Sequence, residues 1–144
     1  MGRPDLADIV TAIVELLKAD AGVAALCGPR VFGGELPPDE TQSMPRHALV
    51  VQPSGGVPFQ PASRLRAEAQ RLDIIAYGPT VHDAVLLRQA AAPVLTLTVR
   101  RVISGVLIQW VQAAGGFMTG RDRDGQWPYA FQSFQTLYST EEAA

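Results

Sequence analysis

The side chains that could bind a metal ion are few and scattered along this sequence. His47, His82 and Cys27 show no CxxC, HxxxH or HxxE spacing. A metal site needs several ligands that converge on one point, and spacings of this kind bring them together. We therefore expect no metal site, with His47 as a surface or interface side chain and His82 in the first turn of a helix.

Catalysis by a nucleophile would need an activated serine, cysteine or threonine beside a base. The chain has no GxSxG nucleophile elbow, and Cys27 ends an apolar stretch, where a buried and unreactive thiol is expected. Asp122 and Asp124 alternate with Arg121 and Arg123, so each carboxylate has a cation beside it and no reason to hold a proton at neutral pH. The sequence therefore predicts no enzymatic activity and no cofactor.

The charge of the chain argues against free-standing nucleic-acid binding, because a formal net charge of −2 gives no basic field for phosphates. Aromatic side chains near the end of the chain could stack on bases, but the final expected strand has no basic residue between them. Core packing and a subunit interface account for them better. These residues are Trp110, Trp127, Tyr129, Phe131, Phe134 and Tyr138.

Length and composition indicate one folded domain over residues 1–144. The chain has 144 residues, 47% of them apolar and 18% charged, which is enough to bury a core without staples. Cys27 is the single cysteine, so an intrachain disulfide is excluded and a reducing cytoplasm is the default. The first residues lack a signal-peptide pattern, and no apolar run reaches the roughly 20 residues that cross a bilayer. We expect a soluble protein.

Hydrophobic periodicity predicts both helices and strands. A helix carries Leu6 to Leu17, with Pro4 and Asp5 at its first turn, and a second short helix is expected over Asp20–Leu26. Residues 33–45 and 54–62 are expected to be long flexible loops, because glycines and prolines interrupt them. The expected strands are Val31-Phe32, His47–Gln52, Arg64–Tyr77 with a bulge near Gln70-Arg71, and the two arms of a hairpin, Val106–Gln112 and Pro128–Tyr138.

The central helix begins after Thr80 and meets Pro93, which leaves two alternatives. Either the helix is kinked or interrupted there, which we favour, or it ends near Ala92 and the alternating residues from Leu95 to Val99 form a strand. Residues 94–102 are thus open between helix and strand, and the tail 140–144 is expected to fray. The expected fold is α+β, with a mainly antiparallel sheet packed against the N-terminal and central helices.

Four short segments are spread over nearly the whole chain: Leu16–Leu26, Arg30–Pro37, Leu72–Gly78 and Asp122–Pro128. With the order of the expected elements, they resemble the small tail-terminator or tail-completion proteins of long-tailed bacteriophages. The stretch Pro93–Val102 departs from that pattern. The resemblance implies a non-enzymatic domain that forms a hexameric ring on the end of the tail tube, halts polymerisation and joins the tail to the head or neck.

The resemblance also implies the partners. These are further copies of the chain, the tail tube protein and a connector or stopper protein of the head–neck region, with DNA only as cargo passing through the bore and no membrane. The location would be the virion tail or neck, after assembly in the host cytoplasm. A near-neutral or acidic total charge suits such a bore, because tight phosphate contacts would stall the DNA.

A closed ring needs an interface in which one surface meets a different surface of the neighbour. We expect both loops to reach toward neighbours, tube or neck, and the charged segment before Trp127 to form a hairpin tip that contacts a partner or lines the bore. The candidate interface residues are Glu35, Pro37, Asp39, Phe59, Arg64, Arg66, Arg121, Asp122, Arg123, Asp124 and Trp127.

Three other functions compete with this interpretation. Another neck component, such as a head-completion or connector protein, would share the lack of catalytic residues, and co-assembly with tail tubes or with portal-bearing heads would separate the two. A tail-tube subunit would polymerise into long cylinders. A small enzyme or ligand-binding domain would need convergent polar groups, which the sequence does not show.

Overall fold

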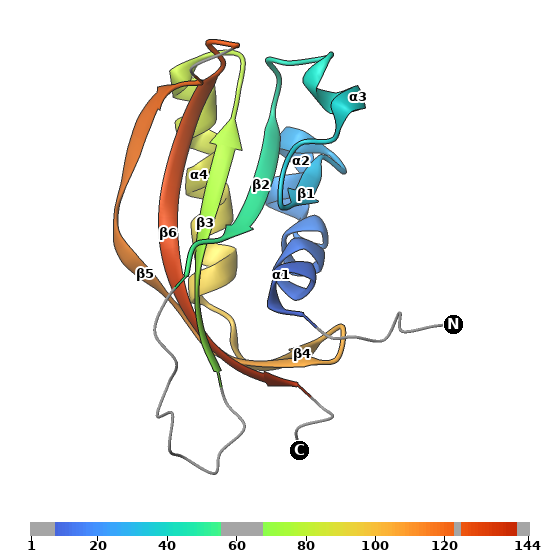
Figure 1. The fold of residues 1–144 in the computed structure, drawn as a ribbon, viewed down its shortest axis with the longest axis vertical. Coiled ribbons are helices and arrows are strands. Elements are labelled where there is room, and N and C mark those ends of the chain that lie inside the picture. Colours follow the sequence, from blue (N-terminus) through green and yellow to red (C-terminus); the bar gives the residue numbers. More distant parts are fainter. Residues whose placement is uncertain (1–7, 56–67, 123–124, 141–144) are drawn as a thin grey trace.

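The computed structural model describes residues 8–55, 68–122 and 125–140. Helices and strands alternate in the first part of the chain, and strands fill the last third (Figure 1). The elements are α1 (Ile9–Lys18), α2 (Ala21–Cys27), β1 (Val31–Gly33), α3 (Pro38–Thr41), β2 (Ala48–Pro53), β3 (Glu68–Tyr77), α4 (Val81–Thr96), β4 (Val99–Ile103), β5 (Val106–Arg121) and β6 (Pro128–Thr140).

The described strands form one six-stranded sheet in the order β1-β2-β3-β6-β5-β4. Within this sheet β1 and β2 are parallel, and the other neighbouring pairs are antiparallel. Helices α1 and α4 cover one face of the sheet, and α2 packs against both helices. At the lower end of Figure 1, β4 and the adjoining parts of β5 and β6 curve beneath α1. The predicted α+β fold, with its mainly antiparallel sheet, is confirmed.

The first two helices begin at aspartate caps. The Asp8 carboxylate accepts a hydrogen bond from the Thr11 amide at 3.0 Å, and the Asp20 carboxylate accepts one from the Val23 amide at 3.0 Å. Each bond satisfies an amide that the helix itself leaves without a partner. The N-cap of α1 is Asp8, whereas Pro4 and Asp5, which were predicted at the first turn, lie outside the described residues.

The core lies between the helices and the sheet. Burying each of its large side chains stabilises the fold by about 1.5–3 kcal/mol. Thr136 is completely buried in the middle of β6, and its hydroxyl donates to the Gln70 carbonyl at 2.9 Å, which removes the cost of an unpaired polar group. The largest fully buried side chains are Phe134, Ile13, Leu17, Leu49, Leu72, Ile74, Leu87, Leu95 and Ile108.

Strand irregularities lie in β5 and not in β3. Every residue of β3 pairs in unbroken register with β6, so the bulge predicted near Gln70-Arg71 is wrong. Ala69 is half-buried on the face opposite the helices, where a small apolar residue is tolerated beside polar ones, and this mimicked a shift in the alternation. In β5 the register shifts at Gln109 and again across residues 114–116. The second shift contains Gly115, which has a positive φ of 122°, and Gly116.

Helix α4 continues through Pro93 to Thr96, and β4 begins at Val99. This agrees with the favoured alternative, a helix that runs past Pro93, although the helix is not interrupted there. The other alternative, a strand from Leu95, is wrong, because Leu95 lies in the last turn of the helix and is buried in the core. Pro93 has no N–H to donate to the carbonyl four residues earlier, and its ring crowds that carbonyl. The end of the helix is closed by the Leu97 amide, which donates to the Pro93 carbonyl at 2.9 Å, and by the Thr98 hydroxyl, which donates to the Val94 carbonyl at 2.8 Å.

Candidate functional site

The link between β5 and β6 forms a tight turn that closes the hairpin predicted from the sequence. The Asp122 amide donates to the Trp127 carbonyl and the Gln126 amide to the Asp122 carbonyl, both at 2.8 Å. The Asp122 carboxylate accepts from the Gly125 amide at 3.0 Å, and the Arg121 guanidinium donates to the Gln126 carbonyl at 3.2 Å. The predicted residues Arg121, Asp122 and Trp127 therefore lie together, and the first two hold the turn.

Trp127 belongs to an aromatic cluster and does not stand alone at the tip. Its ring meets Tyr77 edge-to-face at 6.1 Å between centroids, and Tyr77 meets Tyr129 in the same way at 6.4 Å. The Trp127 ring lies over Gly125 so closely that a Cβ there would be 2.5 Å from it, and a Cβ at Gly120 would be 2.8 Å from the Tyr129 hydroxyl. Each edge-to-face aromatic pair stabilises the fold by about 0.5–1.5 kcal/mol beyond the effect of the area it buries.

An open pocket of about 230 Å³ lies beside this cluster, on the sheet face opposite the helices. Burial, followed by the negative charge of Asp122 and the nearby Tyr129, raises the pKa of Tyr77. The Asp73 carboxylate accepts a hydrogen bond from the Ser133 hydroxyl at 2.5 Å. The lining combines apolar rings with two carboxylates and suits an apolar or cationic side chain of a partner. Its residues are Asp73, Ile75, Tyr77, Asp122, Tyr129 and Phe131.

An apolar row crosses the same face of the sheet. Five directly paired residues, one from each of five neighbouring strands, form it. Their exposure rises from Val50, which is 2% exposed, to Met118, which is 55% exposed at the free side of β5. Sequence reasoning missed the row because its members come from distant strands. The row is Phe32, Val50, Ile75, Phe131 and Met118.

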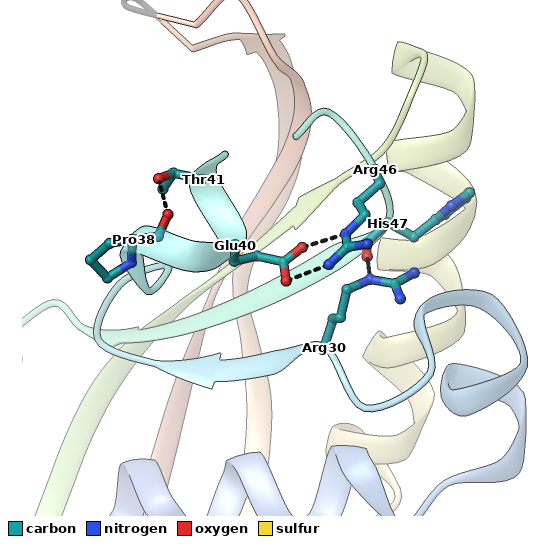
Figure 2. Close-up of polar contacts among 6 residues, drawn as sticks. All are labelled: Arg30, Pro38, Glu40, Thr41, Arg46 and His47. Atoms are coloured by element: carbon teal, nitrogen blue, oxygen red, sulfur yellow. Dashed lines mark hydrogen bonds and ion pairs between the residues drawn. The ribbon is translucent and has the colours of Figure 1, made fainter. Parts of the chain in front are cut away.

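The segment from Gly34 to Arg46 contains order that the sequence did not indicate. It includes the single-turn helix α3, so the prediction that this stretch is too broken for regular structure is wrong. Glu40 is only 7% exposed, and its carboxylate accepts two hydrogen bonds from Arg46, at 2.6 and 2.8 Å (Figure 2). These bonds hold the pKa of Glu40 below its usual value. The ion pair thus holds the loop together where its prolines cannot donate backbone hydrogen bonds.

Neighbouring contacts fix this segment to the sheet. The Arg30 guanidinium donates to the His47 carbonyl at 2.7 Å, and the Thr41 hydroxyl donates to the Pro38 carbonyl at 2.7 Å (Figure 2). Gly34 bonds to β2 twice: its amide donates to the Val51 carbonyl and its carbonyl accepts from the Gln52 side chain, both at 2.8 Å. The predicted flexibility of residues 33–45 stays a prediction.

The predicted interface residues thus fall into separate groups. Glu35, Pro37 and Asp39 lie between the Gly34 and Glu40 anchors, beyond β1, while Arg121, Asp122 and Trp127 lie at the β5–β6 turn; Glu35 and Asp39 are exposed. The remaining candidates lie outside the described residues, as do most of the predicted loop 54–62 and the end of the tail. These candidates are Phe59, Arg64, Arg66, Arg123 and Asp124.

A polar cluster supports β5 where its register shifts. The Arg88 guanidinium donates to the Gln132 side chain at 2.8 Å and lies 3.9 Å above the centre of the Phe117 ring. Gln132 in turn donates to the Gly115 carbonyl at 3.0 Å. Burial lowers the pKa of Arg88, and its Nε is a buried atom without a hydrogen-bond partner among the described residues. Gln132 thereby satisfies the Gly115 carbonyl, which lies within the register shift of β5.

Groups with catalytic or metal-binding chemistry are sparse. Within residues 8–55, 68–122 and 125–140, no three His, Cys, Asp or Glu side chains are placed to hold a metal ion. Cys27 is completely buried, and burial raises the pKa of its thiol, which agrees with the predicted unreactive cysteine. In the same described ranges, no helix is long and apolar enough to cross a membrane.

Solved structures of other proteins share this fold. A chain of the virion of a native gene transfer agent (GTA) particle matches with a TM-score of 0.68 and 16% sequence identity, over 95% of this chain and 98% of that chain. The gp17 protein of bacteriophage SPP1 matches with a TM-score of 0.50 and 15% identity, over 88% of this chain and 85% of that chain. No protein-family model and no curated protein matches the sequence. The chain therefore shares its fold, over nearly its full length, with a virion component and with a bacteriophage protein.

Proposed function

We propose that this protein is a structural component of a virion that caps the tail tube as a hexameric ring, ends tail polymerisation and forms the joint to the head or neck. The observation that carries the proposal is the match to a virion chain over 95% of this chain and 98% of that one. A match over both full lengths compares whole proteins, not one shared motif. The short segments that resemble tail terminators support the same function.

The arrangement of the described residues suits such a function. The polar side chains at the β5–β6 turn hold backbone geometry, and the aromatic rings beside them pack on one another. The surfaces available to partners are the pocket beside Tyr77, the Glu35–Asp39 segment and the sheet edges. In this proposal the partners are further copies of the chain, the tail tube protein and a head–neck connector or stopper protein, and DNA passes through the bore as cargo.

Capping is tested with purified protein and tail tubes assembled in its absence. The proposal expects rings at one end of each tube in negative-stain images, and tubes of limited length when the protein is present during polymerisation. Portal-bearing heads serve as the comparison. Rings that bind heads but never tubes would assign the protein to another neck component, and continuous growth into cylinders of this protein would make it a tube subunit.

A further inference from the structure

An exposed apolar cluster lies where α4 passes into β4. Leu97 is 80% exposed, Val99 63% and Val102 53%, although most large apolar side chains of the described residues are buried. Burying three such side chains against a partner would contribute about 1.5–3 kcal/mol each before the cost of association. Single exposed apolar residues are ordinary, whereas a group of them at a strand edge marks a contact surface.

A groove of about 440 Å³ accompanies this cluster, between the start of α2, the last turns of α4 and β4. Pro93, Leu97 and Val99 give it apolar walls, and Arg101 stands beside them. Arg100 and Arg101 are both exposed, and neither forms an ion pair with a carboxylate in the described part of the chain. Among the described strands β4 pairs with β5 alone, so its outer edge is free. The groove therefore has apolar walls, and it is also lined by Arg101 and by Asp20, whose carboxylate already accepts a hydrogen bond from the Val23 amide.

The Glu35–Asp39 segment has the complementary chemistry. Its sequence, Glu-Leu-Pro-Pro-Asp, has an exposed carboxylate at each end and apolar side chains between them. Pro37 is extended, with φ −63° and ψ 156°, and Pro38 and Asp39 begin helix α3, so little conformational entropy remains to be lost on binding. The hydrogen bonds of Gly34 and Glu40 hold the segment at both ends, which lowers the cost of binding further.

The two surfaces cannot meet within one molecule. Figure 1 shows α3 near one end of the long axis and β4 near the other end. A contact between them must therefore join different copies, and it is heterologous, because one surface of a subunit meets a different surface of its neighbour. Repetition of such a contact gives a ring if the rotation closes.

We infer that the Glu35–Asp39 segment of one copy docks into the α4–β4 groove of the next copy, with its carboxylates beside Arg100 and Arg101 and its prolines against Leu97 and Val99. This inference deepens the proposed function, on which it rests for the ring. The other free edge at this side of the sheet is the second half of β5, where the inserted residues 114–116 break the register. Such insertions discourage edge pairing, so the β4 edge is the better acceptor.

Charge reversal on each surface tests the contact. The variant Arg100→Glu/Arg101→Glu and the variant Glu35→Arg/Asp39→Arg should each self-associate at least about tenfold more weakly than the wild type in sedimentation velocity. An equimolar mixture of the two should regain association with strict one-to-one alternation, because every junction in it again joins opposite charges. The matched control for the arginine variant, Lys18→Glu/Arg71→Glu, makes the same charge change on other exposed positions and should associate as the wild type does.

Circular dichroism establishes that each variant is folded. If a charge variant does not fold, Leu97→Ser/Val99→Ser replaces it, with the same expected loss of association. Wild-type protein that stays monomeric at every soluble concentration overturns the inference, as do reversed variants that associate normally or a mixture that gains no association.

Tail capping is measured separately from self-association. If wild type and both reversed variants all cap tubes and associate equally, the proposed function stands and the docking contact fails. If the charge variants behave as expected but wild-type rings never cap tubes, the docking contact stands and the proposed function fails.

Discussion

The side chains at the two ends of the molecule differ in their contacts: those at the hairpin end bond within their own copy, whereas those at the β4 end are exposed. At the hairpin end, Asp122 and Arg121 bond to the backbone of their own turn and Trp127 packs on Tyr77. At the β4 end, Leu97, Val99 and Val102 are more than half exposed and two arginines stand beside them. The hairpin residues are therefore needed for the shape of one copy, whereas the β4 residues are free to contact another.

The largest loss of stability is expected from Trp127→Ala at the hairpin end. The substitution removes the ring contact with Tyr77 and leaves space over Gly125, which should cost about 2 kcal/mol, below the range for a fully buried tryptophan. Urea unfolding followed by circular dichroism measures it. A variant as stable as the wild type would show that the aromatic cluster does not hold the turn.

Gly125→Ala should disturb the same aromatic cluster by displacing the Trp127 ring. A Cβ at this position would lie 2.5 Å from the Trp127 ring, so the ring must move, at a cost of about 1–2 kcal/mol. Gly116→Ala is the matched control, because nothing lies within 4 Å of its Cβ position. Near-ultraviolet circular dichroism should change for the first variant alone. Equal changes in both would mean that the effect comes from the backbone and not from the ring.

Glu40→Gln should alter the pH dependence of stability. The Arg46 hydrogen bonds lower the pKa of Glu40 in the folded state, so this stabilisation is fully present above the ordinary glutamate value of 4.5 and is lost as the pH falls through the lowered one. The wild type should therefore lose more unfolding free energy between neutral pH and about pH 3 than the variant does. Parallel curves for the two proteins would contradict the role given to the pair.

Tyr138→Phe should alter the pH dependence of stability at alkaline pH. Burial, with the charge and hydrogen bonding of Glu68, raises the pKa of Tyr138 from 10.0 to about 12. Stability from this phenol is fully present below 10.0 and is lost as the pH rises toward about 12, because the unfolded chain ionises first. Urea midpoints over this range should fall less for the variant. Phenolate absorbance should show the last tyrosine titration of the wild type missing in the variant.

The smallest effect on stability is expected from Leu97→Ser at the β4 end. The side chain is 80% exposed, so the free energy of unfolding should change by no more than about 0.5 kcal/mol. Urea unfolding at low protein concentration measures it. A loss as large as that of Trp127→Ala would remove the difference between the two ends and show that Leu97 is part of the folding core.

Local pattern was enough to predict the hairpin and the first helices. Alternation and turn residues indicated β5 and β6, and helical spacing indicated α1 and α2, because these signals come from neighbours in the sequence. The pairing of Tyr77 with Trp127 and the apolar row across five strands could not be predicted this way. Both depend on register between distant strands, which no local pattern encodes.

Tertiary contacts explain the expectations that were wrong. At Pro93 the strand alternative is wrong because Leu95, two residues later, is buried in the core as part of the helix. The segment around α3 is ordered because Glu40 meets Arg46, a pairing invisible among so many prolines. The charged candidates at the turn were recognised as a group, but their contacts with their own backbone became visible only in the structure.

Strands β5 and β6 form one long hairpin that connects the two ends of the molecule. They span 16 and 13 residues and pair along most of their length, from Val106 with Thr140 to Arg121 with Pro128. A pulling force between the ends would run parallel to both strands and load many of their hydrogen bonds at once. Residues 114–116 interrupt that pairing near its middle, and stretching the molecule should therefore begin there.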